Sequence, residues 1–268
     1  MNNVMAQTLS VTTIQANLHW ENKAANLNYF ETCFKQLPPA AELVVLPEMF
    51  STGFSMQPEK FAESMDGATI QWMRDVAKTY RIVLTGSLII EEQGSYYNRL
   101  IWMLPNGELG YYDKRHLFGF AGEDQHYQSG SKRLIASLKG WRIHVQICYD
   151  LRFPVWARQQ PKEGTDPEYD VLLYVANWPE RRSAAWNTLL RARAIENQCY
   201  VIGVNRVGSD GNQIHHCGDS QVINPLGEIL YQSTNEESVH TQVLDKDLLN
   251  EVRNRFPFWK DADSFRLL

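Results

Sequence analysis

The chain has 268 residues, of which 44% are hydrophobic and 21% are charged, and its formal net charge is −5. This composition supports a substantial core in one large or two small domains and excludes a disordered or fibrous protein. The sequence has no Lys/Arg block and no apolar run near the ~20 residues that cross a bilayer, so we expect no nucleic-acid and no membrane partner. Because the N-terminus lacks a basic region followed by an apolar core, we expect a cytoplasmic enzyme.

In chain order, strand-like apolar runs alternate with stretches of helical spacing. The first part predicts a strand at Leu9 to Gln15, a helix marked by Leu27, Phe30, Phe34 and Leu37, a strand at Leu43 to Leu46, a helix at Thr69 to Tyr80 and a strand at Ile82 to Ile90. Two hairpins follow, Tyr97 to Leu104 with Leu109 to Tyr112, and Arg133 to Leu138 with Trp141 to Ile147.

The second half continues this alternation and becomes β-rich. It predicts a strand at Val171 to Val175, a helix at Ala184 to Asn197, a strand at Tyr200 to Val204, a turn at Gly208 to Asn212, strands at Gln221 to Asn224, Ile229 to Gln232 and Val239 to Val243, and a helix at Leu248 to Phe256. Because there is no low-complexity linker and no solenoid repeat, we expect a single layered α/β domain over residues 1–268.

The four cysteines do not indicate a disulfide framework. Cys33, Cys148, Cys199 and Cys217 lie far apart in the sequence and form no CxxC pair, so we expect free thiols. The cluster His215-His216-Cys217 lacks a further ligand at the usual spacing, and we interpret it as loop rather than as a metal site.

Cys148 follows the predicted strand Trp141 to Ile147, in which apolar and polar residues alternate as in a half-buried strand. It falls in phase with the polar face and precedes Pro154 and a predicted helix. Two other predicted strands also end close to a reactive side chain. Leu43 to Leu46 is followed by Glu48, and Leu109 to Tyr112 is followed by Lys114. Because the carboxyl ends of parallel strands gather at one edge of a sheet, we expect these side chains to converge.

A carboxylate, an amine and a thiol together favour acyl transfer. A cysteine with a pKa near ~8.5 is mostly protonated at neutral pH and needs a base, which Glu48 could supply. Lys114 could stabilise the thiolate and the oxyanion formed when sulfur attacks a carbonyl. His144 lies on the same strand but about 13 Å from the thiol, so it is not the base. Nothing in the sequence places the remaining candidates at the thiol: His116, His126, His215 and His216.

Taken singly, each of these residues also fits a structural role, because free cysteines are mostly buried and Glu and Lys are mostly solvated. Together, however, three segments resemble the signature segments of the nitrilase superfamily, the carbon–nitrogen hydrolases. They are Leu46-Pro47-Glu48-Met49-Phe50, the segment Tyr112 to Phe118, and the segment Ile147 to Pro154. The resemblance covers nearly the whole chain, and Ala176 to Pro179 with Arg191 to Asn197 is similar to the omega-amidase branch.

The resemblance implies a four-layer α-β-β-α sandwich. It also implies a homodimer, in which a C-terminal arm at about residues 249–268 forms an interface or folds over its own subunit. No metal and no organic cofactor is implied. In the family's mechanism Cys148 is the nucleophile, Glu48 the general base and Lys114 the oxyanion stabiliser, while Glu123 matches a second glutamate that supports the site.

The omega-amidase branch implies hydrolysis of the terminal amide of 2-oxo dicarboxylic monoamides, such as 2-oxoglutaramate and 2-oxosuccinamate. We expect the backbone N–H of Tyr149 to hold the oxyanion and Arg152 to bind the far carboxylate of this small-molecule amide, unless Arg152 makes a structural ion pair. Asn177 and Trp178 are expected to line the pocket, although Trp178 also suits the core. The alternatives are a nitrilase, an N-carbamoyl amide hydrolase or a non-catalytic binding protein on this fold.

Overall fold

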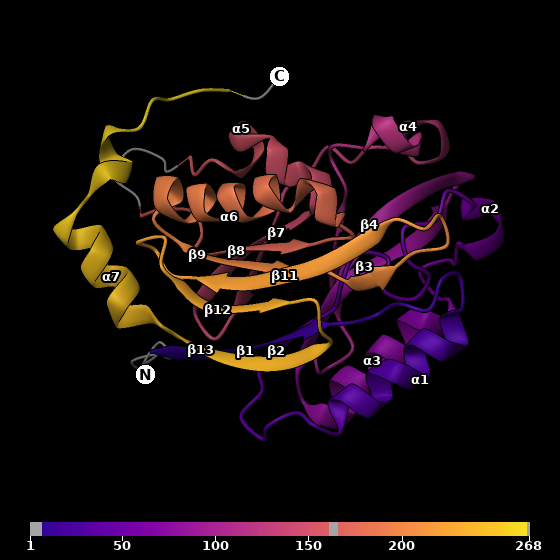
Figure 1. The fold of residues 1–268 in the computed structure, drawn as a ribbon. Helices are drawn as coiled ribbons and strands as arrows, with labels where there is room; N and C mark the ends of the chain where they lie inside the picture. Colours follow the sequence, from indigo (N-terminus) through magenta and orange to yellow (C-terminus); the bar gives the residue numbers. More distant parts are fainter. Residues whose placement is uncertain (1–6, 161–165, 267–268) are drawn as a thin grey trace.

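Two β-sheets face each other in the computed structural model, which describes residues 7–160 and 166–266 (Figure 1). The first sheet contains β1 (Thr8–Gln15), β2 (Leu43–Val45), β3 (Val83–Glu92), β4 (Ser95–Met103), β5 (Leu109–Asp113) and β13 (Ser238–Asp245). The second contains β6 (Leu134–Leu138), β7 (Trp141–Ile147), β8 (Val171–Val175), β9 (Tyr200–Val204), β10 (Val207–Ser209), β11 (His215–Ile223) and β12 (Ile229–Thr234).

Helices cover the outer face of each sheet (Figure 1). They are α1 (Lys23–Phe34) and α3 (Ala68–Tyr80) on the first sheet and α6 (Ser183–Asn197) on the second. The other α-helices are α2 (Pro58–Phe61), α4 (Glu123–His126), α5 (Pro154–Ala157) and α7 (Lys246–Arg255). The described residues also form short 3₁₀ helices: η1 (Gly119–Ala121), η2 (Cys148–Arg152), η3 (Glu180–Arg182) and η4 (Phe258–Asp261). None of the helices in the described ranges is both long and apolar enough to span a membrane.

Strand direction decides where the loops of the first sheet emerge. Its order is β13-β1-β2-β3-β4-β5, and β1, β2 and β3 are mutually parallel. Because β4 is antiparallel to both β3 and β5, β5 again runs in the direction of β2. In the second sheet β7, β8 and β9 are parallel neighbours. The segments that follow β2 and β5 therefore leave the first sheet at the same edge.

The alternation of side chains along β2 explains the layers. Leu43 and Val45 point into the core between the two sheets, whereas Val44 joins the cluster beneath α1 and α3. All three are fully buried, and truncation of a leucine in such a position to alanine typically costs about 2–5 kcal/mol. Helix α3 buries Ile70 and Met73 on one side, as its helical spacing predicts. The four-layer α-β-β-α prediction is thus confirmed.

Two sequence predictions about the second sheet are wrong. Strand β7 is not half-buried, because helices cover the outer face and leave the polar His144 and Gln146 fully buried. The interpretation of His215-His216-Cys217 as loop is also wrong, since these residues begin β11, a strand expected only from Gln221 onward. Strand β10 pairs with the start of β11 and overlaps the beginning of the predicted Gly208 to Asn212 turn, and this strand was not predicted.

Candidate active site

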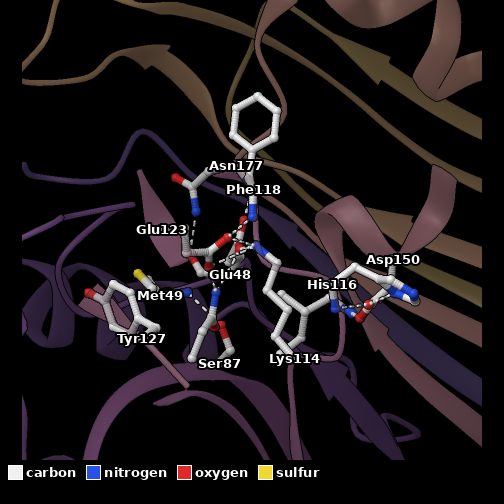
Figure 2. Close-up of polar contacts among 12 residues, drawn as sticks. Glu48, Met49, Ser87, Lys114, His116, Phe118, Glu123, Tyr127, Asp150 and Asn177 are labelled. Carbon is white, nitrogen blue, oxygen red and sulfur yellow. Dashed lines mark hydrogen bonds and ion pairs between the residues drawn. The ribbon is translucent and has the colours of Figure 1, made fainter. Parts of the chain in front are cut away.

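Glu48, Lys114 and Glu123 form a completely buried charge cluster (Figure 2). The ammonium Nζ of Lys114 lies 2.8 Å from Oε1 of Glu48 and 3.0 and 2.9 Å from Oε1 and Oε2 of Glu123. One amine is therefore held between two carboxylates. The ring of Phe54 lies on the Lys114 ammonium at 5.0 Å, which adds a cation–π contact and excludes solvent.

Neutral donors complete the hydrogen bonding of both carboxylates. The side-chain amide of Asn98 donates to Oε1 of Glu48 at 2.8 Å and to Oε1 of Glu123 at 3.2 Å. The backbone N–H of Asn177 donates to Oε2 of Glu48 at 2.8 Å, and the backbone N–H of Phe118 donates to Oε2 of Glu123 at 2.6 Å. Every carboxylate oxygen thus has a donor, as a buried charge requires.

Charge and burial oppose each other at Lys114. Burial disfavours the ammonium, but the carboxylates of Glu123 and Glu48 outweigh burial and raise the pKa of Lys114, so this side chain stays charged. Burial raises the pKa of Glu123, and repulsion from Glu48 adds to that effect, while Lys114 opposes it. The two carboxylates thus favour the charged form of Lys114 at the centre of the cluster.

Cys148 is the first residue of η2 and is 9% exposed. Its φ of 45° lies in the left-handed region, which non-glycine residues rarely occupy. Such strain is typical of residues whose side chain must be presented at a functional site. Burial raises the pKa of the Cys148 thiol well above its ordinary value, and the negative charge of Glu48 raises it further against the opposing effect of Lys114. The resting residue is therefore a thiol, and a proton acceptor is required before it can attack.

The three segments converge, although not in the way expected from one sheet edge. Glu48 and Lys114 follow β2 and β5, whose ends share an edge of the first sheet. Cys148 follows β7 of the opposite sheet. The prediction of a single edge was wrong because the sequence does not reveal that the parallel strands are divided between two sheets.

A buried carboxylate links the turn at Cys148 to the segment that contains Lys114. Asp150 accepts hydrogen bonds from the backbone N–H of Ile147 at 3.0 Å and from the hydroxyl of Tyr112 at 2.7 Å. Its other oxygen accepts from the backbone N–H of His116 at 2.9 Å and contacts Nδ1 of the same residue at 2.8 Å (Figure 2). These contacts fix the register of the two segments.

A pocket of about 210 Å³ opens over Cys148 and Lys114. It brings together all four predicted substrate-binding residues, namely Tyr149, Arg152, Asn177 and Trp178. Trp178 is both pocket wall and core, because it is 4% exposed and packs on Trp186 with ring centroids 5.5 Å apart. Arg152 forms no salt bridge with the described residues. Its guanidinium lies over the Trp178 ring at 4.9 Å.

The sequence analysis did not single out several residues of this site. Asn98 lies in the middle of β4 directly before the charged Arg99, and no local sequence signal sets it apart. Arg182 and the buried His216 also line the pocket. Burial, together with nearby Arg206, lowers the pKa of His216 to about 4, so this imidazole is neutral. Within residues 7–160 and 166–266, no group of His, Cys, Asp or Glu side chains is arranged to hold a metal ion.

Comparison with known proteins agrees with this geometry. The family model described as carbon–nitrogen hydrolase matches residues 10–254. Omega-amidase YafV of Escherichia coli K12 is 43% identical over 260 residues, which cover 97% of this chain and 98% of that protein. A 2-oxoglutaramate amidase of Bacillus subtilis is 30% identical over 255 residues, covering 94% and 96% of the two chains.

Among solved structures, a protein of the CN-hydrolase superfamily from Xanthomonas campestris is similar over almost its full length. Its crystal structure, which has an arsenic adduct in the active site, superposes with a TM-score of 0.95. The two chains are 45% identical, with 97% of this chain and 99% of that chain covered.

Proposed function

The chain belongs to the carbon–nitrogen hydrolase family, and from this premise we propose that it is an omega-amidase that uses Cys148 as its nucleophile. The reaction is hydrolysis of the terminal amide of a 2-oxo dicarboxylic monoamide, such as 2-oxoglutaramate or 2-oxosuccinamate, to the dicarboxylate and ammonia. The observation that carries the proposal is a buried thiol that lines one pocket with Lys114, whose ammonium is held by the carboxylates of Glu48 and Glu123. The omega-amidase relatives support the choice of substrate.

Acylation follows from the roles of three groups. Glu48 takes the thiol proton as the sulfur of Cys148 bonds to the amide carbon. The carbonyl oxygen becomes an oxyanion, which the Lys114 ammonium and the backbone N–H of Tyr149 stabilise; removal of one such donor typically lowers kcat by about 10²–10³-fold. Glu48 then delivers the proton to the amide nitrogen, and the C–N bond breaks. Ammonia departs, and the acyl group remains on Cys148 as a thioester.

Deacylation uses the same base. Glu48 removes a proton from water, whose oxygen attacks the thioester carbon, and the proton passes to the departing sulfur. The products are a carboxylate and the free thiol of Cys148. Glu123 does not meet the substrate in this mechanism. It is a positioning residue that keeps Lys114 charged and directed at the oxyanion, because it contributes two of the three ion-pair contacts to Nζ.

The far carboxylate of the substrate requires a cation in the pocket, and we assign Arg152 to it. Its guanidinium is held against Trp178 without a carboxylate partner among the described residues, and a planar guanidinium matches a carboxylate in two parallel hydrogen bonds. Asn177 and Trp178 then act as pocket walls. Asn177 also holds the base, through its backbone N–H to Glu48.

Ammonia release from a substrate panel tests this function. The panel contains 2-oxoglutaramate, 2-oxosuccinamate, a nitrile and an N-carbamoyl amino acid, and we expect the two omega-amides to give the highest kcat/KM. A clear preference for the nitrile or the N-carbamoyl compound would establish the corresponding family member instead. A wild-type protein that is inactive on every compound would favour a binding protein on this fold.

We further propose that the whole chain is one catalytic unit that functions in the cytoplasm as a homodimer. The C-terminal arm at about residues 249–268 is the candidate interface, although residues 267–268 lie outside the described ranges. The exposed rings of Phe256 and Phe258 stack with centroids 5.7 Å apart, whereas Leu249 and Val252 pack on their own subunit. Light scattering of the wild type and of Phe258→Ser tests this proposal, which predicts that the variant dissociates more readily.

A further inference from the structure

The pocket contains more positive charge than one carboxylate-binding arginine accounts for. Arg181 and Arg182 line it together with Arg152, and none of the three forms a salt bridge with the described residues. Asp210 also lines the pocket, and its Oδ1 accepts hydrogen bonds from the backbone N–H groups of Asn212 and Ile214 in the same turn. The partly buried guanidinium groups of Arg152 and Arg182 therefore have no carboxylate partner among the described residues and can meet an anion that the pocket admits.

Arg182 differs from its neighbour Arg181 because it is held inside the pocket. Arg181 is exposed, whereas Arg182 is partly buried and its guanidinium lies over the Phe118 ring at 5.0 Å. Its carbonyl accepts the indole N–H of Trp178 at 2.8 Å, the ring on which Arg152 rests. The two guanidiniums therefore rest on two aromatic walls of one pocket.

Burial lowers the pKa of Arg182, and the nearby charge of Arg181 and Arg152 lowers it further, while Cys148 acts in the opposite direction. Free arginine has a pKa above about 12, so Arg182 remains charged at neutral pH. Its charge is nevertheless only partly solvated and stands among like charges. A bound anion would relieve this unfavourable situation, which is the condition for a strong charge-assisted hydrogen bond.

We propose that Arg182 is a specificity-determining residue, which together with Arg152 holds the carboxylate and the adjacent 2-oxo oxygen of the substrate. This inference rests on the proposed omega-amidase function and deepens it. A 2-oxo acid presents three oxygen acceptors at that end. The two parallel donors of a single guanidinium cannot satisfy all three. A 2-amino acid such as glutamine carries an ammonium at the same position, where two unpaired guanidiniums would repel it. The arginine pair therefore selects 2-oxo acid amides against 2-amino acid amides.

Steady-state kinetics of Arg182→Gln on charged and uncharged amides test the proposal. We expect kcat/KM for 2-oxoglutaramate to fall by about 10- to 100-fold, the usual loss for a charge-assisted hydrogen bond. With pentanamide, which has the same chain length and no carboxylate, the change stays below about threefold, and discrimination against glutamine falls. Arg182→Lys restores part of the loss because it keeps the charge without the planar fork.

Arg181→Gln is the matched control, since it removes the same charge from the exposed neighbour. For it we expect a loss of about threefold or less on 2-oxoglutaramate, because exposed charges are screened. Equal losses of Arg182→Gln on both amides would show that Arg182 only maintains structure, and unchanged kinetics would show that it does not contact the substrate. Either result overturns the proposal.

Ligand binding separates failure of this inference from failure of the proposed function. If the wild type hydrolyses other amides but no 2-oxo acid amide, the proposed function is wrong. Calorimetry with 2-oxoglutarate and the Cys148→Ala protein then still tests the arginine pair. We expect the Kd for 2-oxoglutarate to rise at least tenfold when Arg182→Gln is introduced into the Cys148→Ala protein. An unchanged Kd would refute the role of Arg182.

Discussion

The pocket joins two charged regions that are built in opposite ways. At its base, Lys114 and the carboxylates of Glu48 and Glu123 are fully buried and fully hydrogen-bonded to one another. Towards its mouth, Arg152 and Arg182 are partly exposed and lack a carboxylate partner among the described residues. The hydrogen bonds at the base of the pocket are complete before substrate binds, whereas the arginines at the mouth gain a carboxylate partner only from the substrate.

This difference separates chemistry from recognition. Groups that act on the reacting atoms need fixed positions, and a closed hydrogen-bond network supplies them without reorganisation during the reaction. Groups that recognise an anion gain most when their donors are free until it binds. Changes at the base should therefore affect kcat and stability, while changes at the mouth should affect kcat/KM for carboxylated amides.

The largest effect on rate is expected in the buried cluster at the bottom of the pocket. Glu48→Gln keeps the shape of the side chain but removes the proton acceptor, so kcat should fall by about 10²–10⁴-fold. Glu123→Gln is the matched variant on the other side of Lys114, and we expect it to retain more activity because Glu123 does not receive the thiol proton. Ammonia release measured with saturating 2-oxoglutaramate compares the two. Equal losses would mean that the two carboxylates do not have distinct roles.

Removal of the central cation tests whether the base is one electrostatic unit. Lys114→Met leaves two buried carboxylates without a counter-charge, and breaking such a pair typically costs about 3–5 kcal/mol in the free energy of unfolding. Burial and Glu48 already raise the pKa of Glu123, and loss of Lys114 removes the opposing effect. Because the raised pKa disfavours folding only where the unfolded carboxyl is ionised, the stability deficit should be largest at pH 8 and shrink towards pH 5.

Urea unfolding of Lys114→Met and the wild type at the two pH values measures this deficit. The double variant Lys114→Met with Glu123→Gln is the control, since it removes one of the uncompensated charges and should recover part of the stability at pH 8. A deficit that is independent of pH would indicate lost packing rather than unpaired charge.

A smaller effect is expected at the neutral bridge between the two carboxylates. Asn98→Ala removes the amide that donates to both Glu48 and Glu123, which should lower kcat by about 10–100-fold, as for other residues that orient catalytic groups. KM for 2-oxoglutaramate should change little, because Asn98 does not line the pocket. A dominant change in KM would show that the two regions are not separate.

The smallest effect is expected at the mouth. Arg152→Gln should lower kcat/KM for 2-oxoglutaramate by about tenfold, near the lower end for hydrogen bonds to charged groups, and leave pentanamide unaffected. Stability should hardly change, since Arg152 forms no ion pair with the described residues. Denaturation midpoints measured together with the kinetics test whether stability is unchanged. A lower midpoint with equal losses on both amides would contradict the separation of recognition from stability.

The resemblance of short ordered segments singled out Glu48, Lys114 and Cys148 as candidates, and the structure brings them together, but their surroundings were only partly predictable from the sequence. The period-two pattern of β7 indicated a half-buried strand. A local pattern contains no information about helices that pack on the outer face of the sheet. Asn98 lies beside Arg99 inside β4, and its contacts depend on pairing between distant segments. Arg182 lies in a charged run that resembles a solvated helix start. The positions of strands follow from local periodicity, whereas the partners of buried charges follow from the packing of the sheets.

Intact-protein mass spectrometry during turnover with 2-oxoglutaramate tests the central claim, that Cys148 carries the acyl group between two steps run by Glu48. Acid quenching of the wild type should give an adduct with the mass of the 2-oxo acyl group, which peptide mapping places on Cys148. The Cys148→Ala protein should show neither adduct nor ammonia. An adduct on another residue, or substantial ammonia release by Cys148→Ala, would contradict the account.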